Sequence, residues 1–204
     1  MAPWLQNLAR YPVLAAGLIM APRGFGTMAA MLTAGQVLRW ADPRWLVAAG
    51  LLCIAWSLWA MTGWTPDVEP STIIPVLMVQ GGGMGLLFIP LQVIGFSTLP
   101  AQYRTDGASL YSLVRNIGSA VGVSVATLAL IRGTHTMQAE IGAAVTPFAR
   151  ALRDGGGVER WWDPATRAGA MALDRAIFRE AQISAYIHDY ALMIVVVLPA
   201  LALL

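Results

Sequence analysis

Five long apolar segments constrain this chain more than any other feature of its sequence. A helix needs about 20 apolar residues to cross a hydrocarbon core of about 30 Å, and each segment is long enough. Their interiors are Ala, Leu, Val, Ile, Met and Gly on all sides, without the continuous polar face of a soluble amphipathic helix. The segments cover residues 12–38, 45–64, 72–97, 107–130 and 185–204. The sequence therefore predicts an all-α membrane protein with about five transmembrane helices.

The composition argues against the main soluble classes. Of the 204 residues, 57% are hydrophobic and 12% are charged, whereas a typical soluble domain carries about 25% charged residues. The net charge of +2 is too small to indicate nucleic-acid binding. No nucleophile-elbow, zinc-helix or phosphate-loop motif is found, and His135 and His188 are too far apart in sequence to indicate a metal site. We expect neither an enzyme nor a cofactor or metal.

The four segments up to residue 131 are joined by short loops, and only the connection at residues 132–184 is long. It carries seven of the thirteen arginines and six acids, which predicts an extramembrane loop. A helix could begin within this loop at Asp163–Pro164, because Asp is a good N-cap and Pro suits the first turn. Trp161 and Trp162 would then anchor that helix at the membrane surface. Its apolar stripe would consist of Ala170, Leu173, Ile177 and Ala181.

Tryptophans mark the ends of the second segment. Trp40 and Trp45 precede or open it and Trp64 closes it, as in the aromatic belts of membrane proteins. Trp56 and Trp59 lie inside the segment, so we expect them to pack against other helices.

Two glycine pairs have the spacing of close helix contacts. Gly81 and Gly85 form one such pair and Gly118 and Gly122 another. Small residues four apart let helix backbones approach closely in lipid. Helix packing is the favoured interpretation, and lining of a substrate path is the alternative.

Polar side chains within the segments are the candidate functional residues. Arg23 lies near the middle of the first segment, where an arginine costs about 2.5–3.5 kcal/mol on insertion scales. It could contact a substrate or act as a gate, or it could pair with an acid on another helix. Arg115, followed by Asn116, could snorkel, pair with Asp106 or line a transport route. Gln80 and Gln92 could hydrogen-bond between helices or bind a ligand.

Five motifs in order resemble those of one transporter family. The match is to the C-terminal part of the major facilitator superfamily, and within it to the 14-helix drug:proton antiporters of the EmrB/QacA type. The loop with Gly35, Arg39, Asp42 and Arg44 is similar to a decayed copy of that superfamily's cytoplasmic motif, with Arg39 where the motif has its aspartate. The other motif-like stretches are 16–24, 80–91, 109–118 and 181–190.

The resemblance implies a fold and a function. The chain would be part of an MFS-type C-terminal half, corresponding to the tenth to fourteenth helices, of a proton-driven multidrug exporter in a bacterial inner membrane. Its partners would be the missing N-terminal helices, membrane lipid and a small hydrophobic or amphipathic substrate. A periplasmic membrane-fusion adaptor protein is compatible with the resemblance but not required by it. The alternative is a stand-alone membrane scaffold or assembly subunit without transport activity.

The resemblance also implies a topology. The loops 39–44 and 98–106 and the C-terminus would be cytoplasmic, and the N-terminus and the 132–184 loop would face outward. Among the short loops, Arg39, Arg44 and Arg104 on the inner side agree with the positive-inside rule. We expect any proton-coupling acid to lie on the missing helices, because no segment holds an Asp or Glu away from its ends.

Overall fold

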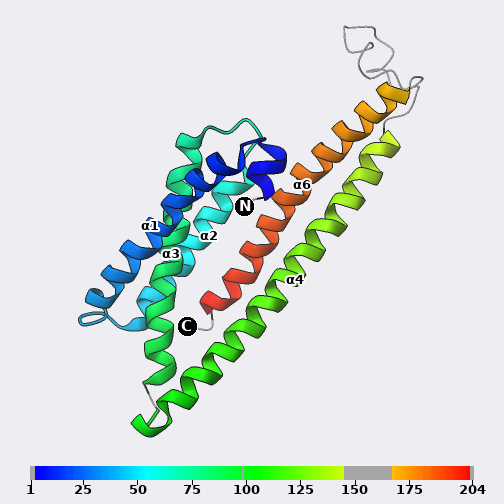
Figure 1. Ribbon diagram of the computed structural model, residues 1–204. Coiled ribbons are helices and arrows are strands. Elements are labelled where there is room, and N and C mark those ends of the chain that lie inside the picture. Colours follow the sequence, from blue (N-terminus) through cyan, green and yellow to red (C-terminus); the bar gives the residue numbers. More distant parts are fainter. Residues whose placement is uncertain (1–2, 98, 145–166, 203–204) are drawn as a thin grey trace. The chain divides into compact units, whose positions relative to one another are not determined.

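A computed structural model describes residues 3–97, 99–144 and 167–202. These residues form helices and connecting turns only. Five helices are long and apolar enough to cross a membrane, which confirms the predicted fold class (Figure 1). They are α1 (Val13–Val37), α2 (Pro43–Thr62), α3 (Pro70–Phe96), α4 (Arg104–Ala144) and α6 (Arg167–Ala202), and two short pieces accompany them, a π-helix η1 (Trp4–Leu8) and a 3₁₀ turn η2 (Ala101–Tyr103).

The starts of α2 and α3 follow from local chemistry. Both begin with a proline, Pro43 and Pro70, at the first helical position, where the missing N–H would have no partner in the helix. An acid, Asp42 or Glu69, precedes each proline in extended conformation. The two helices therefore begin close to where the apolar segments begin in the sequence.

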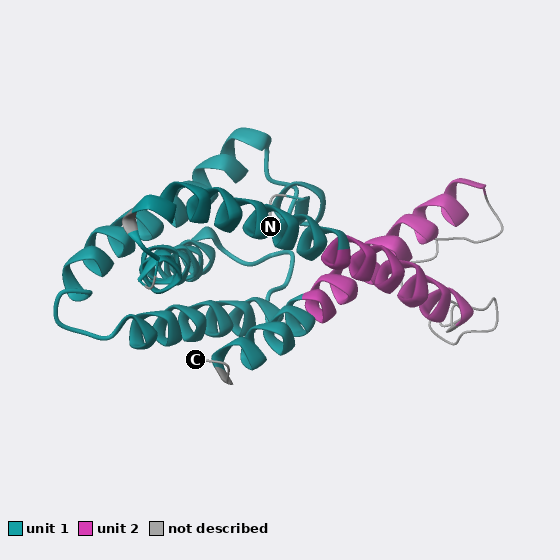
Figure 2. Cartoon of the chain, turned by 90° about the horizontal axis from the view of Figure 1, so that it is seen from below, with its two compact units in different colours: residues 1–124, 190–204 teal, residues 125–189 magenta. Residues whose placement is uncertain are grey.

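The chain divides into two compact units, coloured separately in Figure 2. The first unit comprises Met1–Ser124 and Tyr190–Leu204, and the second comprises Val125–Asp189. In the first unit α3 is the central helix, because it packs against both α1 and α2 (Figure 1).

The contact between α1 and α3 is made through small residues. Gly26 of α1 lies against the backbone of Met78, and Gly81 of α3 lies against the carbonyl oxygen of Arg23. A Cβ at Gly85 would lie 2.5 Å from the carbonyl oxygen of Thr27. The two helix backbones thus approach each other more closely than any larger side chain allows, which confirms the packing role predicted for the first glycine pair.

The contact between α2 and α3 uses the opposite face of α3. A Cβ built on Gly83 would lie 2.7 Å from the carbonyl oxygen of Gly50, and one on Gly50 would lie 2.8 Å from that of Gly83. Gly81 and Gly83 are two residues apart, which is about 200° around a helix. The glycine-rich stretch therefore lets α3 accept a helix on each side.

The second glycine pair has no such partner. A Cβ at Gly118 or Gly122 of α4 would meet no atom of the described chain within 4 Å. The predicted close contact is therefore not made here.

The tryptophans do not all follow the expected pattern. Trp40 and Trp45 are 92% and 74% exposed, as a membrane-surface belt requires. Trp64, however, is buried, with its ring centroid 5.7 Å from that of Trp4 in η1. Trp56 and Trp59 are exposed along α2, so the expectation that they pack was wrong for the described chain.

The described residues of the second unit form two antiparallel helical segments. Gly133 of α4 faces Ala185 of α6, and farther along Gln138 donates a hydrogen bond of 3.5 Å to Asp174. Residues 132–144 continue α4, and residues 167–184 belong to α6 without a break.

The stripe of the interfacial helix expected within the 132–184 loop, from Ala170 to Ala181, is helical and lies on α6, which continues into the last apolar segment. Hydropathy marks where a chain leaves the membrane, but a helix ends only where its sequence stops it, and no proline or glycine interrupts residues 170–198. Residues 155–157 and 161–164, also part of that prediction, lie outside the described residues. The extramembrane position of this region stays a prediction.

Candidate functional site

Arg23 is positioned by the close contact between α1 and α3. Its side chain reaches across to α3, where Nη2 donates to Sδ of Met84 at 3.2 Å. Its carbonyl oxygen accepts a hydrogen bond of 3.0 Å from Thr27, whose hydroxyl also lies 3.0 Å from the carbonyl oxygen of Gly81. Arg23 forms no ion pair with any described residue. It is a half-buried cation with a soft, neutral contact.

Gln80 lies beside this contact, one residue before Gly81. Its side chain is only 8% exposed, and Oε1 accepts no hydrogen bond within the described chain. A buried carbonyl without a donor costs about 1–3 kcal/mol, so such groups normally have a partner. Among the described residues, this level of the helix pair therefore holds a cation without a counter-ion and an acceptor without a donor.

Arg115 contacts the same face of α3 from α4. Its guanidinium carbon lies 5.7 Å from the ring centroid of Phe88, a cation–π geometry. Phe88 is four residues after Met84, so the two side chains are one turn apart on α3. The pairing of Arg115 with Asp106, one of the alternatives in the sequence, is not made, and Asn116 is exposed.

We call Gln80, Met84 and Phe88, with Arg23 and Arg115, the α3 strip. Sequence reasoning identified its polar members but missed Met84 and Phe88. Their spacing of four residues was a usable signal, because it places them on one helix face next to Gln80. Thioether and aromatic side chains adapt to irregular apolar ligands and also attract cations.

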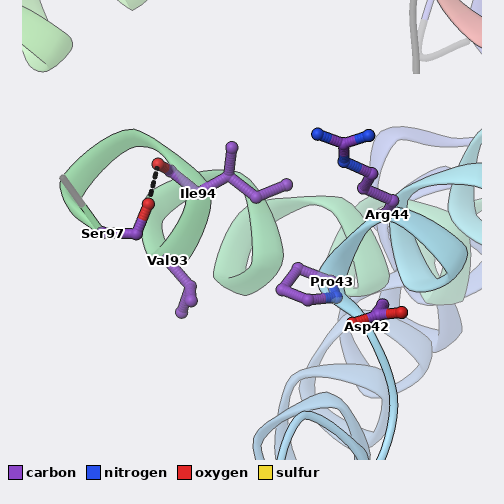
Figure 3. A pocket seen from close by; sticks show the side chains of 6 residues that line it. All are labelled: Asp42, Pro43, Arg44, Val93, Ile94 and Ser97. Carbon is purple, nitrogen blue, oxygen red and sulfur yellow. Dashed lines mark hydrogen bonds between the residues drawn. The ribbon is translucent and has the colours of Figure 1, made fainter.

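The other candidates lie at the C-terminal end of α3. Gln92 lines a cavity of about 440 Å³ there with Phe96 and Arg104. Asp42 and Arg44 line a second cavity of about 450 Å³ (Figure 3). Arg39 is exposed and lines neither cavity, and a Cβ at Gly35 would meet nothing within 4 Å.

The position of Asp189 within its helix differs from the position that the sequence indicated. The sequence places it near the start of the last segment, whereas the structure places it well inside α6. It is buried, and Oδ1 has no hydrogen-bond partner among the described residues. The described residues contain no group of three or more side chains suited to a metal ion.

Comparison with known proteins identifies related transporters. No family model matches the chain. It is 27% identical over 124 residues to an uncharacterized MFS-type transporter, YhcA, of Bacillus subtilis, a match covering 61% of this chain and 23% of that protein. A multidrug resistance protein B homolog of Mycobacterium tuberculosis is 27% identical over 129 residues, which are 62% of this chain and 24% of that protein. The multidrug export protein EmrB of Haemophilus influenzae is 27% identical over 124 residues, which are 60% of this chain and 24% of that protein.

These matches agree with the motifs and with the helices. The chain spans about a quarter of the length of the relatives it matches, as the resemblance to part of a transporter implied. Five apolar helices and transporter relatives together identify a multi-pass membrane protein. The chain is a relative of the MFS-type multidrug transporters of the EmrB kind.

Proposed function

We propose that this chain is the C-terminal portion of a multidrug exporter of a bacterial inner membrane. The observation that carries the proposal is the α3 strip, where Arg23 and Arg115 from two different helices meet one face of α3. Arginines within apolar helices are costly, and they usually face a substrate path or a partner. The names of the relatives, which are multidrug resistance and export proteins, support the same conclusion.

The mechanism would be a change of access without covalent chemistry. In transporters of this kind two helical halves rock against each other around a site near the middle of the bilayer. The α3 strip would supply one wall of that site, with Met84 and Phe88 for apolar surface and Gln80 for a hydrogen bond. Helices from outside this chain would supply the other wall and a counter-ion for Arg23. Proton coupling would use an acid on those helices or Asp189.

The first experiment asks whether the chain needs upstream helices. Expressed alone in a drug-sensitive bacterium, it should confer no resistance and should accumulate poorly. Co-expressed with the upstream helices of a matching transporter, it should become more abundant and confer resistance that a protonophore abolishes. Membrane levels measured by immunoblot separate low abundance from lack of activity. Normal abundance without resistance under both conditions would support the scaffold, and gradient-dependent efflux by the lone chain would contradict the need for upstream helices.

The second experiment tests Arg23 in the complemented transporter. Arg23→Gln should lower resistance by tenfold or more, because it removes the cation from the α3 strip, whereas Arg23→Lys should retain part of it. Arg23→Lys keeps the charge and is therefore the matched control. Resistance is scored against membrane abundance. An Arg23→Gln transporter with normal abundance and full resistance would remove Arg23 from the site.

A further inference from the structure

The two cavities at the C-terminal end of α3 adjoin each other. Val93 and Ser97 line both. Pro43 and Arg44 at the start of α2 also line one of these open hollows (Figure 3), and Arg104 at the start of α4 lines the other. Their volumes are about 450 and 440 Å³, and both hollows are open to the surroundings. The end of α3 therefore stands between two hollows, each with one arginine.

Neither arginine has a partner within the described chain. Arg44 and Arg104 form no hydrogen bond or ion pair with a described residue. The one acid that lines a cavity is Asp42, and its carboxylate leaves the start of α2 in a different direction from the Arg44 guanidinium (Figure 3). Arg104, whose cavity has no acid in its lining, and Arg44, which forms no ion pair with Asp42, favour an anionic ligand.

The remaining lining is that of an amphiphile site. Val93 and Phe96 are apolar, while the Gln92 amide and the Ser97 hydroxyl are polar. Ser97 donates a hydrogen bond of 2.9 Å to the carbonyl oxygen of Ile94. A free phosphate ion gains nothing from the apolar walls, but a phosphate attached to acyl chains does.

The depth of the cavities agrees with this chemistry. Trp40 and Trp45, both strongly exposed, flank the residues 42–44 that line one cavity. Exposed tryptophans beside an apolar helix mark the headgroup level of a bilayer. At the headgroup level of a bilayer, most phosphate groups belong to lipids.

We propose that these cavities bind the headgroup of an anionic phospholipid. Arg44 and Arg104 contact its phosphate, and Val93 and Phe96 contact the adjoining acyl region. This site does not depend on transport, and a chain that carries no substrate would still have it.

Native mass spectrometry of the chain, purified together with the upstream helices of a matching transporter, tests the proposal. Phosphatidylglycerol should be retained in preference to phosphatidylcholine. Arg44→Gln and Arg104→Gln should each weaken retention about fivefold, the effect of about 1 kcal/mol per basic residue near an anionic surface. Arg39→Gln, at the same end of the helices but outside both cavities, should change it less than twofold. Val93→Trp, which fills the shared wall and leaves every charge in place, should weaken retention as strongly as the two arginine variants.

Each alternative has its own result. Equal weakening by Arg39→Gln, or equal retention of phosphatidylcholine, would overturn the proposal in favour of diffuse charge attraction. Displacement of the lipid by millimolar inorganic phosphate would assign the site to the free ion. Circular dichroism verifies that each variant keeps its helix content. If an Arg→Gln variant unfolds, the test of the lipid site uses Val93→Trp, Arg44→Lys and Arg104→Lys instead. The two lysine variants should retain most of the phosphatidylglycerol, and Val93→Trp should lose it. Loss of the lipid in both lysine variants, together with no effect of Val93→Trp, would contradict the proposal.

Discussion

Gly81 and Gly82 are neighbours in α3 with different surroundings. A methyl group at Gly81 would overlap the carbonyl oxygen of Arg23, whereas one at Gly82 would have its nearest neighbour, the carbonyl oxygen of Gly26, at 4.0 Å. Backbone atoms cannot move aside by changing a rotamer. Only Gly81 is therefore required by the approach of α1, although the two residues look alike in the sequence.

We predict opposite effects of alanine at these two positions. Gly81→Ala should lower the free energy of unfolding by about 1–3 kcal/mol, because it overpacks the contact between α1 and α3. Gly82→Ala should leave stability unchanged or raise it by up to about 1 kcal/mol, since alanine is the better helix former. Unfolding in dodecyl sulfate mixed micelles, followed by circular dichroism, measures both. Equal stabilities of the two variants would contradict the close contact.

At the scale of elements, α4 contacts α3 through aromatic side chains near the connection between them. Phe96 of α3 and Tyr111 of α4 meet edge to face with ring centroids 5.7 Å apart. Arg115 lies over Phe88 at the same distance from its centroid, two turns farther from the connection on α3. Gly118 and Gly122, farther along α4, have no neighbour within 4 Å. The described contacts between the two helices in the first unit are therefore side-chain contacts near the connection.

A double-mutant cycle should detect the cation–π contact between these helices. Phe88→Leu and Arg115→Gln should each destabilise the chain, and the double variant should lose less than their sum, with a coupling of about 0.5–1 kcal/mol for an exposed pair. Phe96→Leu combined with Arg115→Gln is the control, because Phe96 contacts Tyr111 instead. Additive effects of Phe88→Leu and Arg115→Gln would indicate that the ring and the guanidinium do not interact.

At the scale of the whole molecule, several apolar faces have no cover. On α1 the exposed residues Leu14, Leu18, Phe25 and Leu32 follow a helical spacing, and a Cβ at Gly24 would meet nothing within 4 Å. None of the most apolar stretch of α4 is buried. Lipid could cover such surfaces, but the matched residues make up only about a quarter of each relative's length, so the rest of such a protein would offer further helices. These faces are where we expect such helices to pack.

Cysteine labelling tests the topology of the assembled protein. Cys53→Ala first removes the single native cysteine. In that background Gly142→Cys, an exposed position of α4 with open space around it, should react with a membrane-impermeant maleimide in intact cells. Arg39→Cys should react only after permeabilisation, because the loop it belongs to is predicted to be cytoplasmic. The reverse pattern would invert the topology and place the arginine-rich 132–184 region inside.

The membrane class and the starts of α2 and α3 could be predicted from the sequence. Apolar length, proline after an acid, and arginine within an apolar helix depend on the residues themselves and their immediate neighbours. The continuation of α4 to Ala144 could not be predicted from hydropathy, because hydropathy reports the surroundings of a helix and not its end.

Only the tertiary structure decided which candidates meet. It showed that Met84 and Phe88 receive Arg23 and Arg115, and that Arg44 and Arg104 lie beside adjoining cavities. It also separated Gly81, which touches α1, from Gly118, which touches nothing described. Contacts between residues far apart in sequence depend on how the helices pack. A glycine pair indicates that another helix can approach the backbone closely, but it does not indicate which helix does so.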